Sequence, residues 1–225
     1  MSGADPHASG ALLRAGAGHG AARGLVLLHG RDASARDILG LGQAVADDAT
    51  AMVAPEAAGS SWWPVSFLAP MAQLQPWLDS ALAAVDRAVA ALEADGLTRD
   101  RIALAGFSQG ACLALDHAAR RGGPWRAVLG LSGGLVGTAD AGGARAQALY
   151  GHAPKRFDYG ARLDGVPVLL ACHNADPHIP EARVTETAQV LRDMGATVDL
   201  RLHGGAGHGL GPGDVEAARA LLGAG

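Results

Sequence analysis

The sequence predicts a single α/β domain, built on a mostly parallel sheet with helices on both faces. Short apolar runs of strand length, such as the one at 24–29, alternate with segments of helical periodicity along the chain. This alternation implies right-handed crossovers and therefore parallel neighbouring strands. The chain has 225 residues, of which 49% are hydrophobic and 18% charged, and this suits one globular domain with a full core.

The elements of the first half follow from local signals. Residues 1–23 are expected to be an N-terminal segment in which Ser9–Arg14 forms an edge strand or stays loose, and the main domain covers 24–225. Ser34 is placed to cap a helix. The long helix that ends at Gly96 carries a 3.6-residue apolar stripe typical of a helix that faces the core. The expected elements are strands at 24–29 and 51–54 and helices at 35–49 and 72–95.

The second half continues the same alternation. Residues 133–165 lack periodicity and contain several glycines, so we expect an excursion outside the sheet rather than a second domain. No long lid with an amphipathic helix is apparent. The expected elements are strands at 101–105, 127–132, 166–171 and 197–202 and helices at 111–120, 180–194 and 214–222.

Composition argues against several classes of partner. A net charge of -4 gives no reason to expect nucleic acid, and no apolar run approaches the ~20 residues of a membrane span. Residues 1–10 lack the pattern of a secretory signal. Cys112 and Cys172 are expected to be buried free thiols, which indicates a reducing cytoplasm. His7 and His19 have no ligand spacing, so no metal site is expected.

The segment Gly106-Phe107-Ser108-Gln109-Gly110 lies between a predicted strand and a predicted helix. A Gly-x-Ser-x-Gly in this context is typical of a nucleophile elbow, in which a strained turn presents the serine hydroxyl above the sheet edge. The alternative is an ordinary surface turn that contains a serine. The context therefore predicts Ser108 as a nucleophile.

Asp176 and His208 follow the next predicted strands, at the sheet edge where parallel strands end. Such a carboxylate can orient a histidine, although Asp176 could instead only shape the turn before a helix. His208 lies among glycines and is predicted to be the general base, with a solvated loop histidine as the alternative. The order Ser108, Asp176, His208 is that of an α/β-hydrolase triad.

Other histidines compete with His208 for the role of base. We expect two of them, His29 and His203, to be structural and hydrogen-bonded to loop backbone. The other two flank Asp176 in one loop and are less well placed to be its partner. The rivals are His29, His173, His178 and His203.

Acyl transfer also needs N–H donors for a developing oxyanion. The backbone N–H groups of Gln109, which follows the nucleophile, and of Arg31, in the loop after the first strand, are the expected pair. The Arg31 side chain could contact substrate or could pair with Asp32.

The loop at 56–70 carries unusually large side chains for a polar connection. These residues could line an apolar substrate pocket, could merely pack the loop onto the domain, or could form an exposed contact between two copies of the chain. The residues are Trp62, Trp63, Phe67 and Leu68.

Four motifs together resemble the phospholipase/carboxylesterase family of α/β-hydrolases, which includes acyl-protein thioesterases and is related to dienelactone hydrolases. They are Leu-Leu-His29-Gly-Arg, Gly-Phe-Ser108-Gln-Gly-Ala, Asp176-Pro-His-Ile-Pro and Gly-His208-Gly. The resemblance runs from Gly24 to the C-terminus. Asp32 is a departure, because the family loop more often has a small residue there.

This resemblance implies a serine esterase that acts on small carboxylic esters without a metal or organic cofactor. It implies that Ser108, Asp176 and His208 form the triad and that the N–H groups of Arg31 and Gln109 form the oxyanion hole. The expected substrates are short-chain or aromatic esters. A thioesterase or an acyltransferase with the same triad remains an alternative, as does a non-catalytic binding protein of this fold.

Overall fold

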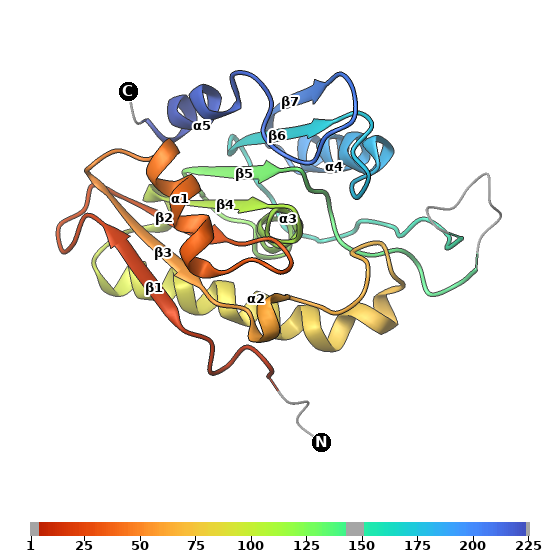
Figure 1. Ribbon diagram of the computed structural model, residues 1–225, viewed down its shortest axis with the longest axis horizontal. Coiled ribbons are helices and arrows are strands. Elements are labelled where there is room, and N and C mark those ends of the chain that lie inside the picture. Colours follow the sequence, from red (N-terminus) through yellow and green to blue (C-terminus); the bar gives the residue numbers. More distant parts are fainter. Residues whose placement is uncertain (1–4, 143–150, 224–225) are drawn as a thin grey trace.

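The computed structural model describes residues 5–142 and 151–223, and in it a seven-stranded sheet is flanked by helices on both faces (Figure 1). The strands are β1 (Leu12–Gly16), β2 (Arg23–Leu28), β3 (Thr50–Pro55), β4 (Ile102–Phe107), β5 (Ala127–Leu131), β6 (Pro167–His173) and β7 (Thr197–His203). Their order across the sheet is β1-β3-β2-β4-β5-β6-β7. Strand β1 is antiparallel to β3, and every other pairing is parallel. The predicted fold class is therefore confirmed.

The α-helices are α1 (Ala35–Val45), α2 (Met71–Ala94), α3 (Gln109–Arg121), α4 (Glu181–Asp193) and α5 (Asp214–Leu222), with short 3-10 turns at Ala58–Ser60 and Arg99–Arg101. Ser34 caps α1 as predicted, in a capping box with Asp37. Helix α1 is shorter than the expected 35–49. The backbone becomes extended at Ala46, and the Asp47 carboxylate then holds a turn by accepting hydrogen bonds from the Ala49 N–H and the Thr50 hydroxyl.

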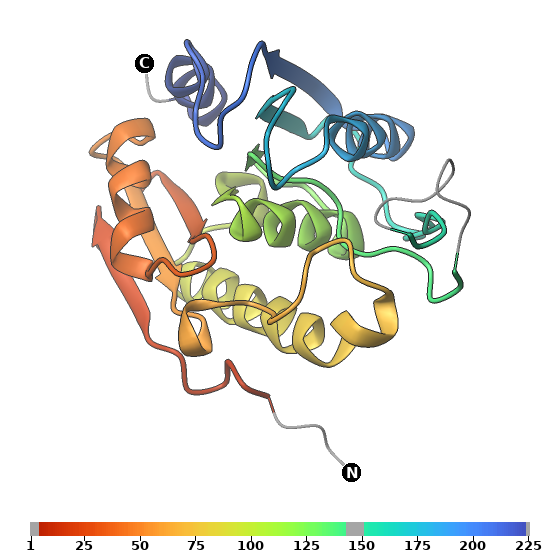
Figure 2. The ribbon, with the colours of Figure 1, turned by 45° about the vertical axis from the view of Figure 1, so that its right-hand side comes forward.

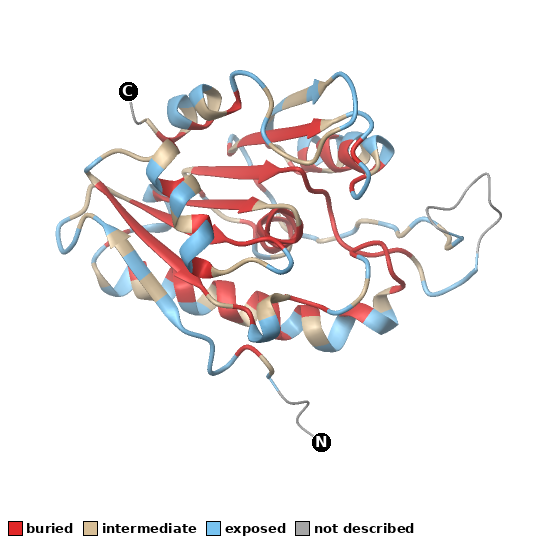
Figure 3. Ribbon diagram, viewed as in Figure 1, coloured by how far each residue is buried: buried red, intermediate tan, exposed pale blue. Residues whose placement is uncertain are grey.

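Each face of the sheet has its own apolar core. The side chains of β2 alternate between them, with Leu25 and Leu27 on one face and Val26 and Leu28 on the other. Helices α1 and α5 cover the first face, while α2, α3 and α4 cover the second. Burial on both faces explains why the central strands are continuous apolar runs, and Figure 3 shows them as the buried centre of the molecule.

The N-terminal segment joins the sheet through β1, which begins at Leu12 rather than Ser9. It forms an edge by pairing with β3, from Leu12 opposite Pro55 to Gly16 opposite Ala51. Arg23 already belongs to β2.

The described parts of the connection between β5 and β6 leave the sheet, as expected for 133–165, while residues 143–150 of that prediction lie outside the described ranges. The part that follows β5 runs beside the loop that precedes α2 (Figure 2). The backbone N–H groups of Gly137 and Thr138 donate hydrogen bonds to the carbonyl groups of Phe67 and Ala69, at 2.6 and 3.1 Å. The excursion thus supports the loop that carries the tryptophans. None of the helices within the described ranges is long and apolar enough to cross a membrane.

Candidate active site

Ser108 lies in the turn between β4 and α3 with φ 54° and ψ -120°, a conformation that is strained for a residue with a side chain. The flanking glycines allow the turn to be this tight. A Cβ atom at Gly106 would collide with the backbone of Gly110, and one at Gly110 would collide with the backbone of Leu28. The local structure is therefore the strained turn that the Gly-x-Ser-x-Gly pattern predicts.

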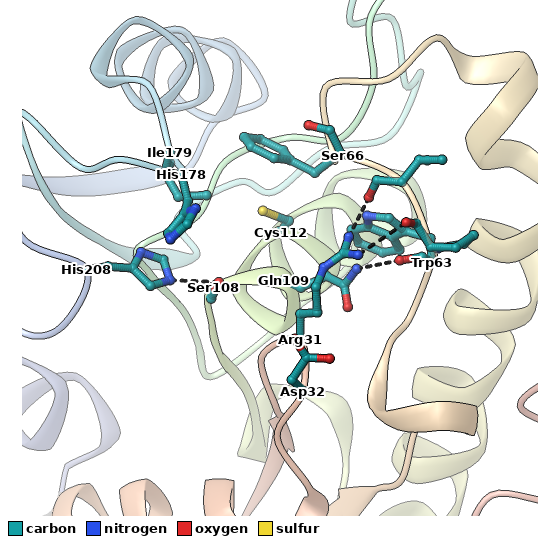
Figure 4. Close-up of a pocket in the computed structure, with 13 residues that line it drawn as sticks. Arg31, Asp32, Trp63, Ser66, Ser108, Gln109, Cys112, His178, Ile179 and His208 are labelled. Carbon is teal, nitrogen blue, oxygen red and sulfur yellow. Dashed lines mark hydrogen bonds between the residues drawn. The ribbon is translucent and has the colours of Figure 1, made fainter.

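A row of hydrogen bonds connects three side chains that are far apart in the sequence. The His208 Nε2 atom is 2.9 Å from the Ser108 Oγ atom, and the His208 Nδ1 atom is 2.8 Å from Asp176 Oδ2 (Figure 4 shows the first contact). An imidazole with its proton on Nδ1 satisfies both contacts, because it donates to the carboxylate and accepts from the hydroxyl. The structure thus brings the three predicted residues together.

Asp176 uses its two carboxylate oxygens differently. Oδ1 accepts hydrogen bonds from the backbone N–H groups of His178 and Ile179, at 2.8 and 3.0 Å, whereas Oδ2 faces His208. Asp176 is therefore both a turn residue and a hydrogen-bond partner of His208, so the two interpretations are compatible. Burial raises the pKa of Asp176, but the hydrogen bonds from His208 and from the two backbone groups outweigh it, so the pKa lies below its usual value.

The Cys172 thiol also lies against this carboxylate, with Sγ 3.6 Å from Asp176 Oδ2. Burial raises the pKa of Cys172 to about 12, and the negative charge of Asp176 adds to this effect. The cysteine therefore stays protonated and can act as a weak donor to the carboxylate.

Hydrogen bonds between loops fix the distance from Asp176 to His208. The Asn174 side-chain oxygen accepts from the Gly205 N–H at 2.9 Å, and the Asn174 N–H donates to the His203 carbonyl at 2.9 Å. The His208 ring itself is held between two others, with Phe107 at 5.0 Å and His178 at 4.9 Å between ring centroids.

The rival histidines occupy other positions. His29 is buried, with Nδ1 bonded to the Gly30 carbonyl and Nε2 accepting from the Ala57 N–H, which is the backbone role expected of it. For His203 that expectation is wrong. Its Nε2 atom lies 2.9 Å from the Asp214 carboxylate, because the start of α5 brings this buried acid against the end of β7.

Arg31 and Gln109 contribute both backbone and side chain to the site. Neither backbone N–H group donates a hydrogen bond to any residue of the described chain, and Gln109 opens α3, where N–H groups have no helical partner. The Gln109 side chain meanwhile accepts from the Trp62 N–H and donates to the Trp63 carbonyl, both at 2.9 Å. The Arg31 guanidinium binds the carbonyl groups of Pro64 and Val65, so the alternative pairing with Asp32 is wrong.

A cavity of about 470 Å³ opens over Ser108. Trp63 and Phe67 line it, while Trp62 and Leu68 pack inside the domain. The lining residues are Arg31, Asp32, Trp63, Pro64, Val65, Ser66, Phe67, Ser108, Gln109, Cys112, His178, Ile179 and His208. Burial raises the pKa of the Cys112 thiol to about 12, so this thiol is a protonated, apolar part of the wall.

Trp62 is held between two buried histidines, with His7 at 5.4 Å and His29 at 5.1 Å between ring centroids, and its Nε1–H donates to the His29 carbonyl. Both tryptophans of the loop are fully buried. The idea of an exposed tryptophan loop as a contact between two copies is therefore wrong, since the side chains that would form it face the interior.

Sequence reasoning did not assign several residues near the site to it. Cys112 and Ile179 line the cavity, as does His178, which was considered only as a rival base. The Ser132 hydroxyl lies 3.3 Å from the carbonyl of Gly209, the residue after His208. One signal was available, because Ser132 ends a predicted strand next to the strand that leads to Ser108. Within residues 5–142 and 151–223, no three His, Cys, Asp or Glu side chains group closely enough to hold a metal ion.

Comparison with known families gives a match over most of the chain. The family model described as phospholipase/carboxylesterase matches residues 19–223. None of the curated proteins matches the sequence.

Solved structures agree with this match. A phospholipase/carboxylesterase from Dyadobacter fermentans is 34% identical, with a TM-score of 0.83, covering 95% of this chain and 96% of that one. The esterase PE8 is 28% identical, with a TM-score of 0.71 and coverage of 96% and 98%. A carboxylesterase from Mesorhizobium loti, 20% identical with a TM-score of 0.67 and coverage of 96% and 99%, shares the fold.

Proposed function

Because the chain belongs to the phospholipase/carboxylesterase family of α/β-hydrolases, we propose that it hydrolyses small carboxylic esters through Ser108. The family and its esterase neighbours support an ester-hydrolysing enzyme in general terms. The observation that carries the specific proposal is the hydrogen-bonded row from Ser108 through His208 to Asp176, placed at the floor of a cavity.

In the first step, His208 removes the Ser108 proton through Nε2 while the hydroxyl oxygen attacks the ester carbonyl carbon. Asp176 keeps the other ring proton on Nδ1 and stabilises the imidazolium, which its lowered pKa allows because the carboxylate stays ionised at neutral pH. The N–H groups of Arg31 and Gln109 stabilise the oxyanion. The imidazolium then protonates the departing alcohol and leaves an acyl-enzyme.

In the second step, His208 takes a proton from a water molecule as the water oxygen attacks the acyl carbon. The bond between the acyl carbon and Ser108 Oγ then breaks, His208 returns the proton to Oγ, and the carboxylic acid is released. The backbone N–H groups proposed to bind the oxyanion contribute strongly, since losing one such donor typically reduces the rate by about 10²–10³. The side chains of Arg31 and Gln109 support their own backbone N–H groups by binding carbonyl and N–H groups of the loop at 62–64.

Short-chain or aromatic esters are the proposed substrates. Trp63, Phe67 and Ile179 give the cavity apolar walls, and its volume of about 470 Å³ suits a small ester. The same triad attacks thioesters, so a thioester of the same acyl group belongs in the substrate panel. No cofactor takes part in this mechanism, and the two buried free thiols favour a cytoplasmic location.

The test is covalent labelling with a fluorophosphonate, read by intact mass. We expect one adduct on the wild-type protein and none on Ser108→Ala. An ester panel graded by acyl length would follow, with the thioester as a separate arm. Absence of an adduct on folded wild-type protein would overturn the proposed mechanism and favour a binding protein.

A further inference from the structure

The cavity has two sides with different chemistry, divided by Ser108. In Figure 4, His208 and His178 lie on one side of Ser108, whereas Arg31, Gln109 and Trp63 lie on the other. The backbone donors proposed for the oxyanion belong to the second side. What the first side contacts in a substrate follows from the proposed function.

The proposed mechanism fixes which part of an ester faces the first side. In the tetrahedral intermediate, the oxyanion points to the N–H groups of Arg31 and Gln109. The leaving alcohol oxygen must come within hydrogen-bond reach of His208 Nε2, because that atom delivers its proton. The alcohol portion of the substrate therefore lies beside the residues that flank His208 within the cavity.

His178 is the polar residue that flanks His208 there. Its side chain is exposed, lines the cavity and stands edge-on to the His208 ring, at 4.9 Å between centroids and an interplanar angle of 77°. Its backbone N–H donates to Asp176 Oδ1 at 2.8 Å, so the loop that holds the triad carboxylate also positions this ring.

The ring nitrogens of His178 differ from those of His29, His203 and His208. The Nδ1 atom of His173 also has no partner among the described residues, but it is buried and His173 does not line the cavity. His29, His203 and His208 each bond their ring nitrogens to the protein, whereas no described residue hydrogen-bonds the ring of His178. A neutral imidazole provides one donor and one acceptor. Both are available on the alcohol side of the cavity, next to the apolar side chain of Ile179.

We infer that the His178 ring hydrogen-bonds an oxygen on the alcohol portion of the substrate. The enzyme then prefers esters whose alcohol carries a further hydroxyl group, such as hydroxyethyl esters, over alkyl esters of the same length. A hydroxyl group suits this ring because it both donates and accepts. His178 thus acts as a specificity residue for the leaving group.

The test uses a matched pair of substrates, hydroxyethyl butyrate and propyl butyrate. They have the same number of non-hydrogen atoms and form the same butyryl-enzyme, so deacylation is common to both and kcat/KM compares acylation. The key variant is His178→Phe, which keeps a flat ring against His208 but removes the nitrogens. His178→Gln, which restores a donor and an acceptor without the ring, is the rescue.

We expect the kcat/KM ratio of hydroxyethyl to propyl butyrate to fall about threefold to tenfold in His178→Phe, the usual net effect of one hydrogen bond. The ratio carries the test rather than the activity on propyl butyrate alone, because His178 also packs against His208. His178→Gln should recover part of the ratio. Any difference in intrinsic reactivity between the two esters cancels when variant and wild type are compared.

An equal loss on both esters, with the ratio unchanged, would overturn the inference and assign His178 to the positioning of His208. Wild-type protein that hydrolyses neither ester and takes no fluorophosphonate would instead overturn the proposed function. The two failures are therefore distinguishable, because the first leaves a labelled and active wild-type enzyme.

Discussion

Two serines occupy equivalent places at the ends of neighbouring strands. Ser108 follows β4 with φ 54°, and Ser132 follows β5 with φ 52°. Each donates its N–H to the next strand of the sheet, Ser108 to the Leu131 carbonyl at 2.9 Å and Ser132 to the Ala171 carbonyl at 2.7 Å. Both serines therefore have a positive φ and lie at the carboxyl ends of their strands.

Their surroundings differ. Helix α3 begins directly after Ser108, and the hydroxyl group is directed at His208 Nε2 at the floor of the cavity. The chain leaves the sheet after Ser132, whose side chain is fully buried and lies against the Gly209 carbonyl. In the proposed mechanism, a serine with a positive φ at a strand end is therefore not enough to form a nucleophile, because Ser132 lacks both the imidazole partner and the opening to the cavity that Ser108 has. Ser132 instead lies against the loop that carries His208.

The largest effect should come from Ser108→Ala. In the proposed mechanism this change removes the attacking atom, so kcat should fall by about 10⁶, as in other serine hydrolases that lose the nucleophile. Ester hydrolysis by purified protein gives the measurement, with circular dichroism to confirm folding. Activity within tenfold of wild type would rule out Ser108 as the nucleophile.

Asp176→Asn should have the next largest effect. The amide can present its NH₂ group to His208 Nδ1 and favour the wrong tautomer, so kcat should fall by about 10⁴. A matched control is Asp214→Asn, which removes the charge from another histidine–aspartate pair, His203–Asp214, but leaves the row to Ser108 intact. We expect this control to retain most of its activity per folded molecule, and an equal loss in both variants would contradict the assignment.

Ser132→Ala should reduce kcat modestly, by about threefold to tenfold, since it removes one hydrogen bond that supports the loop of His208. KM should change little, because Ser132 does not line the cavity. The control is Ser80→Ala, which also removes a buried hydroxyl group, one that binds the N-terminal segment, and it should lower stability without lowering kcat. An unchanged kcat for Ser132→Ala would contradict a role of Ser132 in supporting the loop that carries His208.

The strain at Ser108 should appear as a difference in stability. Ser108→Gly and Ser108→Ala both lack the hydroxyl group, but glycine adopts a positive φ at little cost. The free energy of unfolding of the glycine variant should therefore exceed that of the alanine variant by about 1 kcal/mol, measured by denaturant titration. Equal stabilities would show that the turn at Ser108 is not strained.

The pH dependence of stability should report on Asp176 at acid pH. Its pKa is lowered in the folded protein, so its contribution is present above the pKa of the unfolded chain, about 4, and is lost as the pH falls through the folded value. Wild-type protein should lose more stability than Asp176→Asn between about pH 5 and pH 2. Parallel stability curves for the two proteins would contradict this sign.

Local sequence signals were sufficient for the fold class and for the residues that approach Ser108. Strand and helix periodicity, with glycines at Gly106 and Gly110, predicts the turn, because its geometry depends on residues adjacent in the chain. Asp176 and His208 follow from the rule that the carboxyl ends of parallel strands share one edge of the sheet. These inferences need the order of elements but no knowledge of side-chain direction.

Only the tertiary structure decided which large side chain faces the cavity and which faces the core. Trp62 and Trp63 are neighbours in the sequence, yet Trp62 packs between two histidines while Trp63 lines the cavity. In the same way, Arg31 binds loop carbonyl groups rather than Asp32, and His178 meets His208 from another loop. Such contacts depend on how distant loops pack, and residues adjacent in the chain do not encode that packing.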